Sequence, residues 1–140
     1  MPYFLDKDIL GGALSGHPNV VSRIIESVDE VYLSSITLEE AIGAQIHHIN
    51  TQRSKPTVGV AEASNFLVKL IDSLSGYSMI AYSEAAEDIF RRYPASVKRI
   101  GSMDCRLAAH AIVLGFTVDT RNISDFSRIP GVMCVDWSVE

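Results

Sequence analysis

Tyr3-Phe4-Leu5-Asp6-Lys7-Asp8 opens the chain by joining a short apolar run to acidic residues. The run Tyr3–Leu5 predicts a short, buried first strand, and Asp6 marks its end. An acidic side chain beside a buried strand terminus is unusual unless it has a partner. The stretch therefore predicts both the first strand of a sheet and a polar site at its carboxyl end.

Outward from this stretch, short apolar runs alternate with helical patterns. Further strands are expected at 31–33, 78–80, 116–118 and 132–135. Helices are expected at 9–15, 19–28, 37–49, 60–74, 83–92 and 102–114, with a loop at 50–58. Strands that alternate with helices favour a parallel sheet covered on both faces. We predict the α/β class, a three-layer α/β/α sandwich with a central, mostly parallel sheet, in a single domain over 1–140.

Helix boundaries are predicted from capping residues. Asn19, Ser83 and Ser102 stand where helices are expected to begin, and Gly115 stands where one is expected to end. Thr37 is predicted to be an N-cap, with Glu40 at the third helical position as in a capping box.

Composition limits the function classes. The net charge is −5, which argues against general nucleic-acid affinity, but residues 91–140 carry 7 basic and 5 acidic side chains and could present a modest positive rim. The sequence shows no run typical of a membrane span and no signal peptide at its start. Two cysteines without a CxxC spacing indicate no disulfide framework. We therefore expect a cytoplasmic protein with no membrane partner.

Acidic signals recur at four predicted element boundaries. They lie at 4–8, 37–40, 101–104 and 120–126. In parallel sheets, ligand sites gather at the carboxyl ends of the strands, so these segments can meet in one cleft. Converging carboxylates repel one another, and a hard cation such as Mg²⁺ relieves that repulsion.

Simpler explanations exist for single residues. Asp104 and Glu40 are predicted in first helical turns, where the helix dipole alone favours an acid. Asp6-Lys7-Asp8 after a strand also fits a haloacid-dehalogenase-like phosphatase, although no downstream acidic pair such as Asp-Asp follows. The adjacent His47 and His48 lack the spacing of a zinc motif.

The ordered set of motifs resembles a known family. Phe4-Leu5-Asp6-Lys7-Asp8, Thr37-Leu38-Glu39-Glu40, the segment from Gly101 to His110 and the segment from Thr120 to Phe126 follow one another as in PIN domains, particularly VapC-type toxins of bacterial toxin–antitoxin pairs. The resemblance spans essentially the whole chain. It implies a Mg²⁺-dependent (or Mn²⁺-dependent) ribonuclease built as an α/β/α sandwich.

The resemblance also implies site residues. Asp6, Glu40 and Asp104 match family acids, with Asp6 and Asp104 as the expected metal ligands and Glu40 as a ligand through water or an orienting group. Asn122 occupies a position that is Asp in many members. Asp125 is a candidate to lend a carboxylate there. Thr37 is expected to support the site, and Arg106 and Arg121 are candidate RNA contacts.

Partners follow from the same resemblance. It implies an RNA substrate, an antitoxin of VapB type that covers the cleft, and a homodimer. The alternative is a catalytically weak or silent PIN-like module that binds RNA or protein, since Asn122 carries no charge where many members have an acid.

Overall fold

A parallel β-sheet forms the centre of the molecule in the computed structural model, which describes residues 1–55, 57 and 59–139. Its strands are β1 (Tyr3–Leu5), β2 (Val31–Ser34), β3 (Ser78–Ile80), β4 (Thr117–Asp119) and β5 (Met133–Val135). Their order is β3-β2-β1-β4-β5, and every pairing is parallel. The chain builds outward from β1 through β2 to β3, then returns to place β4 on the other side of β1. The strand order therefore reverses between the neighbouring strands β1 and β4, which makes their carboxyl ends the topological switch point.

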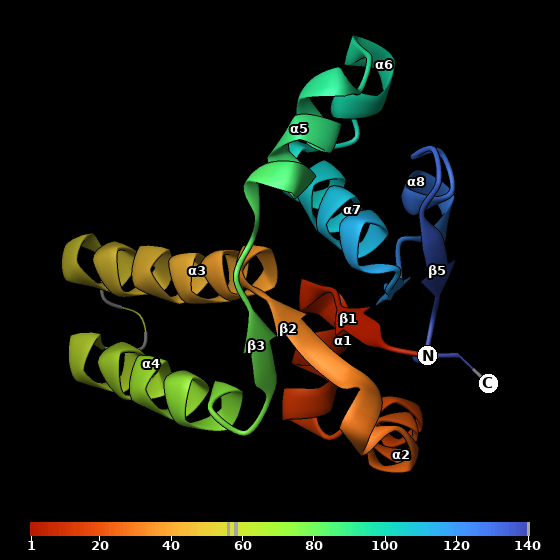
Figure 1. Cartoon of the computed structure of the whole chain (residues 1–140). Coiled ribbons are helices and arrows are strands. Elements are labelled where there is room, and N and C mark those ends of the chain that lie inside the picture. Colours follow the sequence, from red (N-terminus) through yellow and green to blue (C-terminus); the bar gives the residue numbers. More distant parts are fainter. Residues whose placement is uncertain (56, 58, 140) are drawn as a thin grey trace.

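Helices connect the strands and cover the sheet (Figure 1). Their bounds are α1 (Lys7–Ser15), α2 (Pro18–Glu26), the 3₁₀ turn η1 (Val28–Glu30), α3 (Ser35–Ser54), α4 (Val60–Leu74), α5 (Glu84–Arg92), α6 (Ala95–Lys98), α7 (Ser102–Leu114) and α8 (Ile123–Phe126). Among the described residues, no helix is long and apolar enough to cross a membrane.

Two hydrophobic cores lie on opposite faces of the sheet. Successive side chains of a strand point to opposite faces, so Phe4 enters one core and Leu5 the other. The Phe4 core packs against α5, α6 and α7, and the Leu5 core packs against α1, α2 and the end of α4. This arrangement confirms the predicted three-layer α/β/α sandwich, with a sheet that is wholly rather than mostly parallel.

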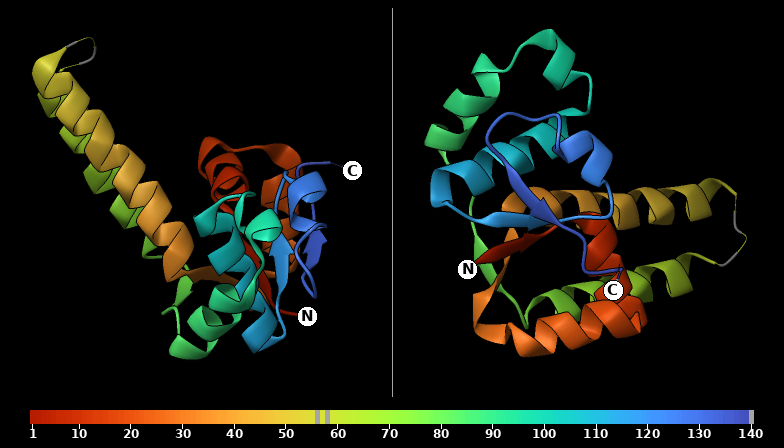
Figure 2. Two further views of the ribbon diagram at one scale, coloured as in Figure 1. Left: turned by 90° about the horizontal axis from the view of Figure 1, so that it is seen from above. Right: turned by 90° about the vertical axis from the view of Figure 1, so that its right-hand side faces the viewer.

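The helices α3 and α4 form an arm that projects from the rest of the molecule (Figure 2). The prediction of a loop over 50–58 was wrong for its first part, because α3 continues to Ser54. Ile49 and Gln52 are buried near the end of α3, and the Gln52 side chain accepts hydrogen bonds from the backbone of Thr57 and Gly59. The burial of Ile49 and Gln52 and these hydrogen bonds stabilise the end of α3, although residues 50–54 are polar. Residues 56 and 58 lie outside the described part.

Two N-caps differ from prediction in α2 and α7. Asn19 lies inside α2, which begins at Pro18, and its amide donates to the Ser138 carbonyl instead. Ser102 is the first residue of α7, and Gly101 occupies the cap with a φ of 140° that suits glycine. The Ser83 cap of α5 and the Gly115 end of α7 are confirmed.

The predicted capping box at Thr37 was also wrong. Ser34 is the N-cap of α3, and its hydroxyl accepts a hydrogen bond from the Ile36 amide at 3.1 Å. Thr37 is fully buried inside the first turn, and its hydroxyl donates to the Leu5 carbonyl at 3.0 Å. Because α3 starts earlier than predicted, Glu40 stands in its second turn.

Candidate metal centre

Three carboxylates from distant parts of the chain meet beside the switch point. Asp6 follows β1, Glu40 lies on α3, and Asp104 lies in the first turn of α7. One carboxylate oxygen from each lies within 4.8 Å of the others. Sequence reasoning grouped these three residues, and the fold brings them together.

Asp6 is held rigidly at the end of β1. Its Oδ1 accepts a hydrogen bond from the Lys7 amide at 2.8 Å, and its Oδ2 accepts one from the Thr120 hydroxyl at 2.7 Å. Its own amide donates to the Asp119 carbonyl at 2.8 Å, which joins the ends of β1 and β4. Burial nevertheless raises the pKa of Asp6, against the lowering effect of the bonds from Thr120 and Lys7.

Glu40 reaches the cluster with one oxygen unsatisfied. Its Oε1 is buried and has no hydrogen-bond partner among the described residues. Burial, followed by repulsion from Asp6 and Asp104, raises the pKa of Glu40 to about 7. A helix-dipole explanation fails here because Glu40 lies beyond the first turn of α3.

Asp104 faces the same space from the start of α7. Burial, together with repulsion from Asp6 and Asp125, raises the pKa of Asp104 to about 6. A helix N-terminus favours the charged form of an acid, yet here burial and neighbouring carboxylates outweigh that effect.

The cluster fits a divalent cation. Its three acids repel one another, each has a raised pKa, and the buried Glu40 Oε1 lacks a partner. Nearby cationic charge would favour the ionised form of all three and satisfy the free oxygen. Oxygen-only ligands are those that hard cations such as Mg²⁺ take. The group can therefore hold a divalent metal ion.

Asn122 lies beside the cluster in a hydrogen-bonded turn after β4. Its amide N–H donates to the Thr120 hydroxyl oxygen at 3.0 Å, and its side-chain Nδ2 donates to Asp125 at 2.9 Å. Asp125 also pairs with Arg128 at 3.5 Å and contributes to the raised pKa of Asp104. Asn122 and Asp125 thus form one unit at the rim of the site.

The two candidate RNA-contact arginines differ in their surroundings. Arg121 is exposed on the turn between β4 and α8. Arg106 is partly buried, pairs with Glu87 at 3.1 Å, and stacks over the Phe90 ring at 4.0 Å from its centroid. The charge of Arg106 is therefore largely compensated within the protein.

Sequence reasoning missed two residues that shape the site. Thr120 links the Asp6 carboxylate to the turn that carries Asn122, and its place directly after β4 was the available signal. Asp119 is fully buried and accepts a hydrogen bond from the Trp137 amide at 2.9 Å, which ties the C-terminal segment to β4. Burial raises the pKa of Asp119 to about 7.

Comparisons with known proteins identify the family of the chain. Residues 3–132 match the PIN domain family. The chain is 27% identical to Ribonuclease VapC2 of Rickettsia felis, with 98% of both chains covered. It superposes on a DNA-bound VapBC structure from Salmonella typhimurium with a TM-score of 0.77 at 23% identity, covering 98% of each chain. It superposes on VapBC2 from Rickettsia felis, bound to a promoter DNA fragment, with a TM-score of 0.74 at 25% identity, covering 98% of this chain and 99% of the other. The chain belongs to the PIN domain family.

Proposed function

We propose that this protein is an endoribonuclease that hydrolyses RNA phosphodiester bonds with Mg²⁺, or Mn²⁺, held by Asp6 and Asp104 beside Glu40. The observation that carries the proposal is the meeting of the carboxylates of Asp6, Glu40 and Asp104, together with a buried Glu40 oxygen that has no hydrogen-bond partner among the described residues. The ribonuclease relative, aligned over nearly its whole length, supports RNA as the substrate.

Each residue has a proposed role. Asp6 and Asp104 hold the metal, which when bound polarises water and stabilises charge on the phosphate and leaving oxygens. Glu40 orients the attacking water and accepts its proton, because its carboxylate lies beside the two metal ligands. Thr120 keeps the Asp6 carboxylate in place. Asn122 and Asp125 orient water at the rim, and Thr37 anchors α3 to β1 through the Leu5 carbonyl.

A cleavage assay tests this function. Purified protein is expected to cut a fluorescently labelled single-stranded RNA with Mg²⁺ and to stop when EDTA is added. Asp6→Asn removes a charge from the metal site, and we expect its rate to fall at least ~100-fold while circular dichroism stays unchanged. Asp29→Asn, at an exposed position in η1, is the matched control and should cleave normally.

The same assay decides between the enzyme and a silent binding module. Two features of Asn122 favour the silent module. It is uncharged where many family members have an aspartate, and its side-chain amide already donates a hydrogen bond to Asp125. RNA that binds but stays intact at millimolar Mg²⁺ and Mn²⁺ would favour the silent module. The phosphatase alternative is not retained, because the PIN family match covers residues 3–132.

The proposed toxin role rests on the VapBC complexes that the chain resembles in structure. The Salmonella and Rickettsia structures are VapBC complexes, so we propose an antitoxin of VapB type as partner, with a toxin homodimer in the cytoplasm. Expression of the chain alone is expected to slow bacterial growth. Co-expression with the product of a short adjacent open reading frame should restore growth and yield a co-purifying complex; harmless expression of active enzyme would contradict the toxin role.

A further inference from the structure

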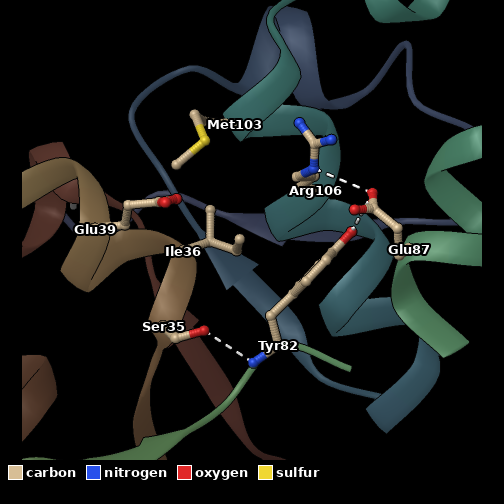
Figure 3. Close-up of a pocket in the computed structure, with 7 residues that line it drawn as sticks. All are labelled: Ser35, Ile36, Glu39, Tyr82, Glu87, Met103 and Arg106. Carbon is tan, nitrogen blue, oxygen red and sulfur yellow. Dashed lines mark hydrogen bonds and ion pairs between the residues drawn. The ribbon is translucent and has the colours of Figure 1, made fainter. Parts of the chain in front are cut away.

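A cavity is lined by residues of α3 and α7, the two helices that also carry Glu40 and Asp104 (Figure 3). Its volume is about 430 Å³, within the range of small-ligand pockets, roughly 300–1,000 Å³. Glu39 and Met103 line it, and each directly precedes a member of the cluster in the sequence. The pocket therefore lies within one residue of the cluster along both α3 and α7.

The walls of the pocket suit a flat, largely apolar group. Ile36, Met103 and the ring of Tyr82 supply apolar and aromatic surface. Tyr82 is fixed at both ends, because its amide donates to the Ser35 hydroxyl at 2.8 Å and its hydroxyl donates to Glu87 at 3.3 Å. Single-stranded RNA is commonly recognised by unstacked bases that pack on such side chains.

The charge of the pocket favours a base over a phosphate. Arg106 is already paired with Glu87, and Glu39 is exposed and forms no ion pair within the described part of the chain. These three side chains carry a formal charge of −1, the sum of two carboxylates and one guanidinium. A phosphate would be repelled by Glu39, whereas a neutral base would not be.

The polar edge of the pocket presents a carboxylate and a guanidinium. Figure 3 shows the Glu39 carboxylate facing the cavity from α3, with Arg106 across from it on α7. A carboxylate can accept two parallel N–H bonds, and guanine offers two neighbouring donors on its Watson–Crick edge. Adenine, cytosine and uracil each offer a single amino or imino group there.

We propose that this pocket binds an RNA nucleobase next to the scissile phosphate, and that Glu39 makes guanine the preferred base. The placement beside a scissile phosphate rests on the proposed nuclease function. The pocket's affinity for a base is a separate property, because its lining does not include the three carboxylates.

Methionine methyl NMR tests the pocket without any cleavage. Protein labelled at its methionine methyl groups is titrated with guanosine, adenosine, cytidine and uridine in EDTA, so that neither metal nor phosphate contributes. A base stacked in the pocket shifts the Met103 methyl signal, while the exposed Met79 and Met133 serve as internal controls. We expect guanosine to bind about tenfold more tightly than the other three nucleosides.

Two variants sharpen the test. Glu39→Gln replaces one acceptor with a donor, so the preference for guanosine should shrink to about twofold or less. Glu62→Gln, at an exposed position on α4, should behave like wild type. A Met103 signal that does not move with guanosine, or that responds equally to all four nucleosides, would overturn the proposal.

The outcomes also separate this inference from the nuclease function. If guanosine shifts the Met103 signal in a protein that cuts no RNA, the base-pocket proposal is supported and the nuclease proposal is refuted. If the protein cleaves RNA but no nucleoside shifts the Met103 signal, the nuclease proposal is supported and the base-pocket proposal is refuted.

Discussion

Glu40 shows how much of the site depends on single atoms. Its buried Oε1 has no partner in the described structure, and its pKa is raised to about 7 by burial and by Asp6 and Asp104. In the absence of metal, the folded protein holds these carboxylates close together at a cost in free energy. That cost is relieved either by a proton or by a cation.

The pH dependence of stability follows from these raised pKa values. The pKa of Glu40 rises from 4.5 to about 7 on folding, and that of Asp104 from 3.8 to about 6. The folded state thus binds more protons than the unfolded state in this range, so stability is lost as pH rises. We expect the free energy of unfolding in EDTA to fall by about 1–2 kcal/mol from pH 4.5 to 7.5, allowing for solvent screening at these half-buried groups.

Urea denaturation at several pH values measures this effect. Glu40→Gln should flatten the pH profile in part, because it removes one group with a strongly raised pKa while Asp119 keeps its own pKa of about 7. Glu62→Gln should leave the profile unchanged. Stability that rises steadily with pH in EDTA would contradict the electrostatic account of the cluster.

At the scale of elements, the start of α3 decides where Glu40 lies. The stretch from Ser34 to Glu40 contains three hydroxyl residues that could cap a helix, Ser34, Ser35 and Thr37, and a start at Thr37 would place Glu40 in the capping-box position. The fold selects Ser34, because Thr37 is buried against β1 and donates to the Leu5 carbonyl. This choice depends on a contact 32 residues away, which local pattern cannot reveal. The end of α3 over 50–54 was missed for a similar reason, because burial of Ile49 and Gln52 outweighs the polar composition of this segment.

Removal of the Ser34 hydroxyl tests this start of α3. The hydroxyl caps the Ile36 amide and also lies 2.8 Å from His110 Nδ1, and the whole residue is buried. Ser34→Ala should therefore cost about 2–3 kcal/mol of stability, the sum of a lost cap and an unsatisfied buried histidine nitrogen. Ser83→Ala removes an ordinary cap and should cost about 1 kcal/mol. Equal losses in denaturant unfolding would refute the dual role of Ser34.

At the scale of the whole molecule, the alternation of strands and helices was enough to predict the sandwich and the edge of the sheet where acids gather. Asp6 and Asp104 could be placed because each lies at a recognisable boundary: Asp6 directly follows β1, and Asp104 lies in the first turn of α7 after Gly101. Strand order could not be predicted from pattern. Without it, the contact of Thr120 with Asp6, 114 residues apart, stayed hidden. The pocket between α3 and α7 likewise depends on tertiary packing.

RNA cleavage by this protein is expected to require a metal ion held by Asp6 and Asp104, with Glu40 beside them. Mn²⁺ titration followed by electron paramagnetic resonance counts bound metal directly, and cleavage can be measured in the same samples. We expect wild-type protein to bind Mn²⁺ and to gain activity in proportion to the bound fraction, whereas Asp6→Asn and Asp104→Asn lose both at equal metal concentration. Undiminished Mn²⁺ binding or cleavage in these two variants would contradict the account.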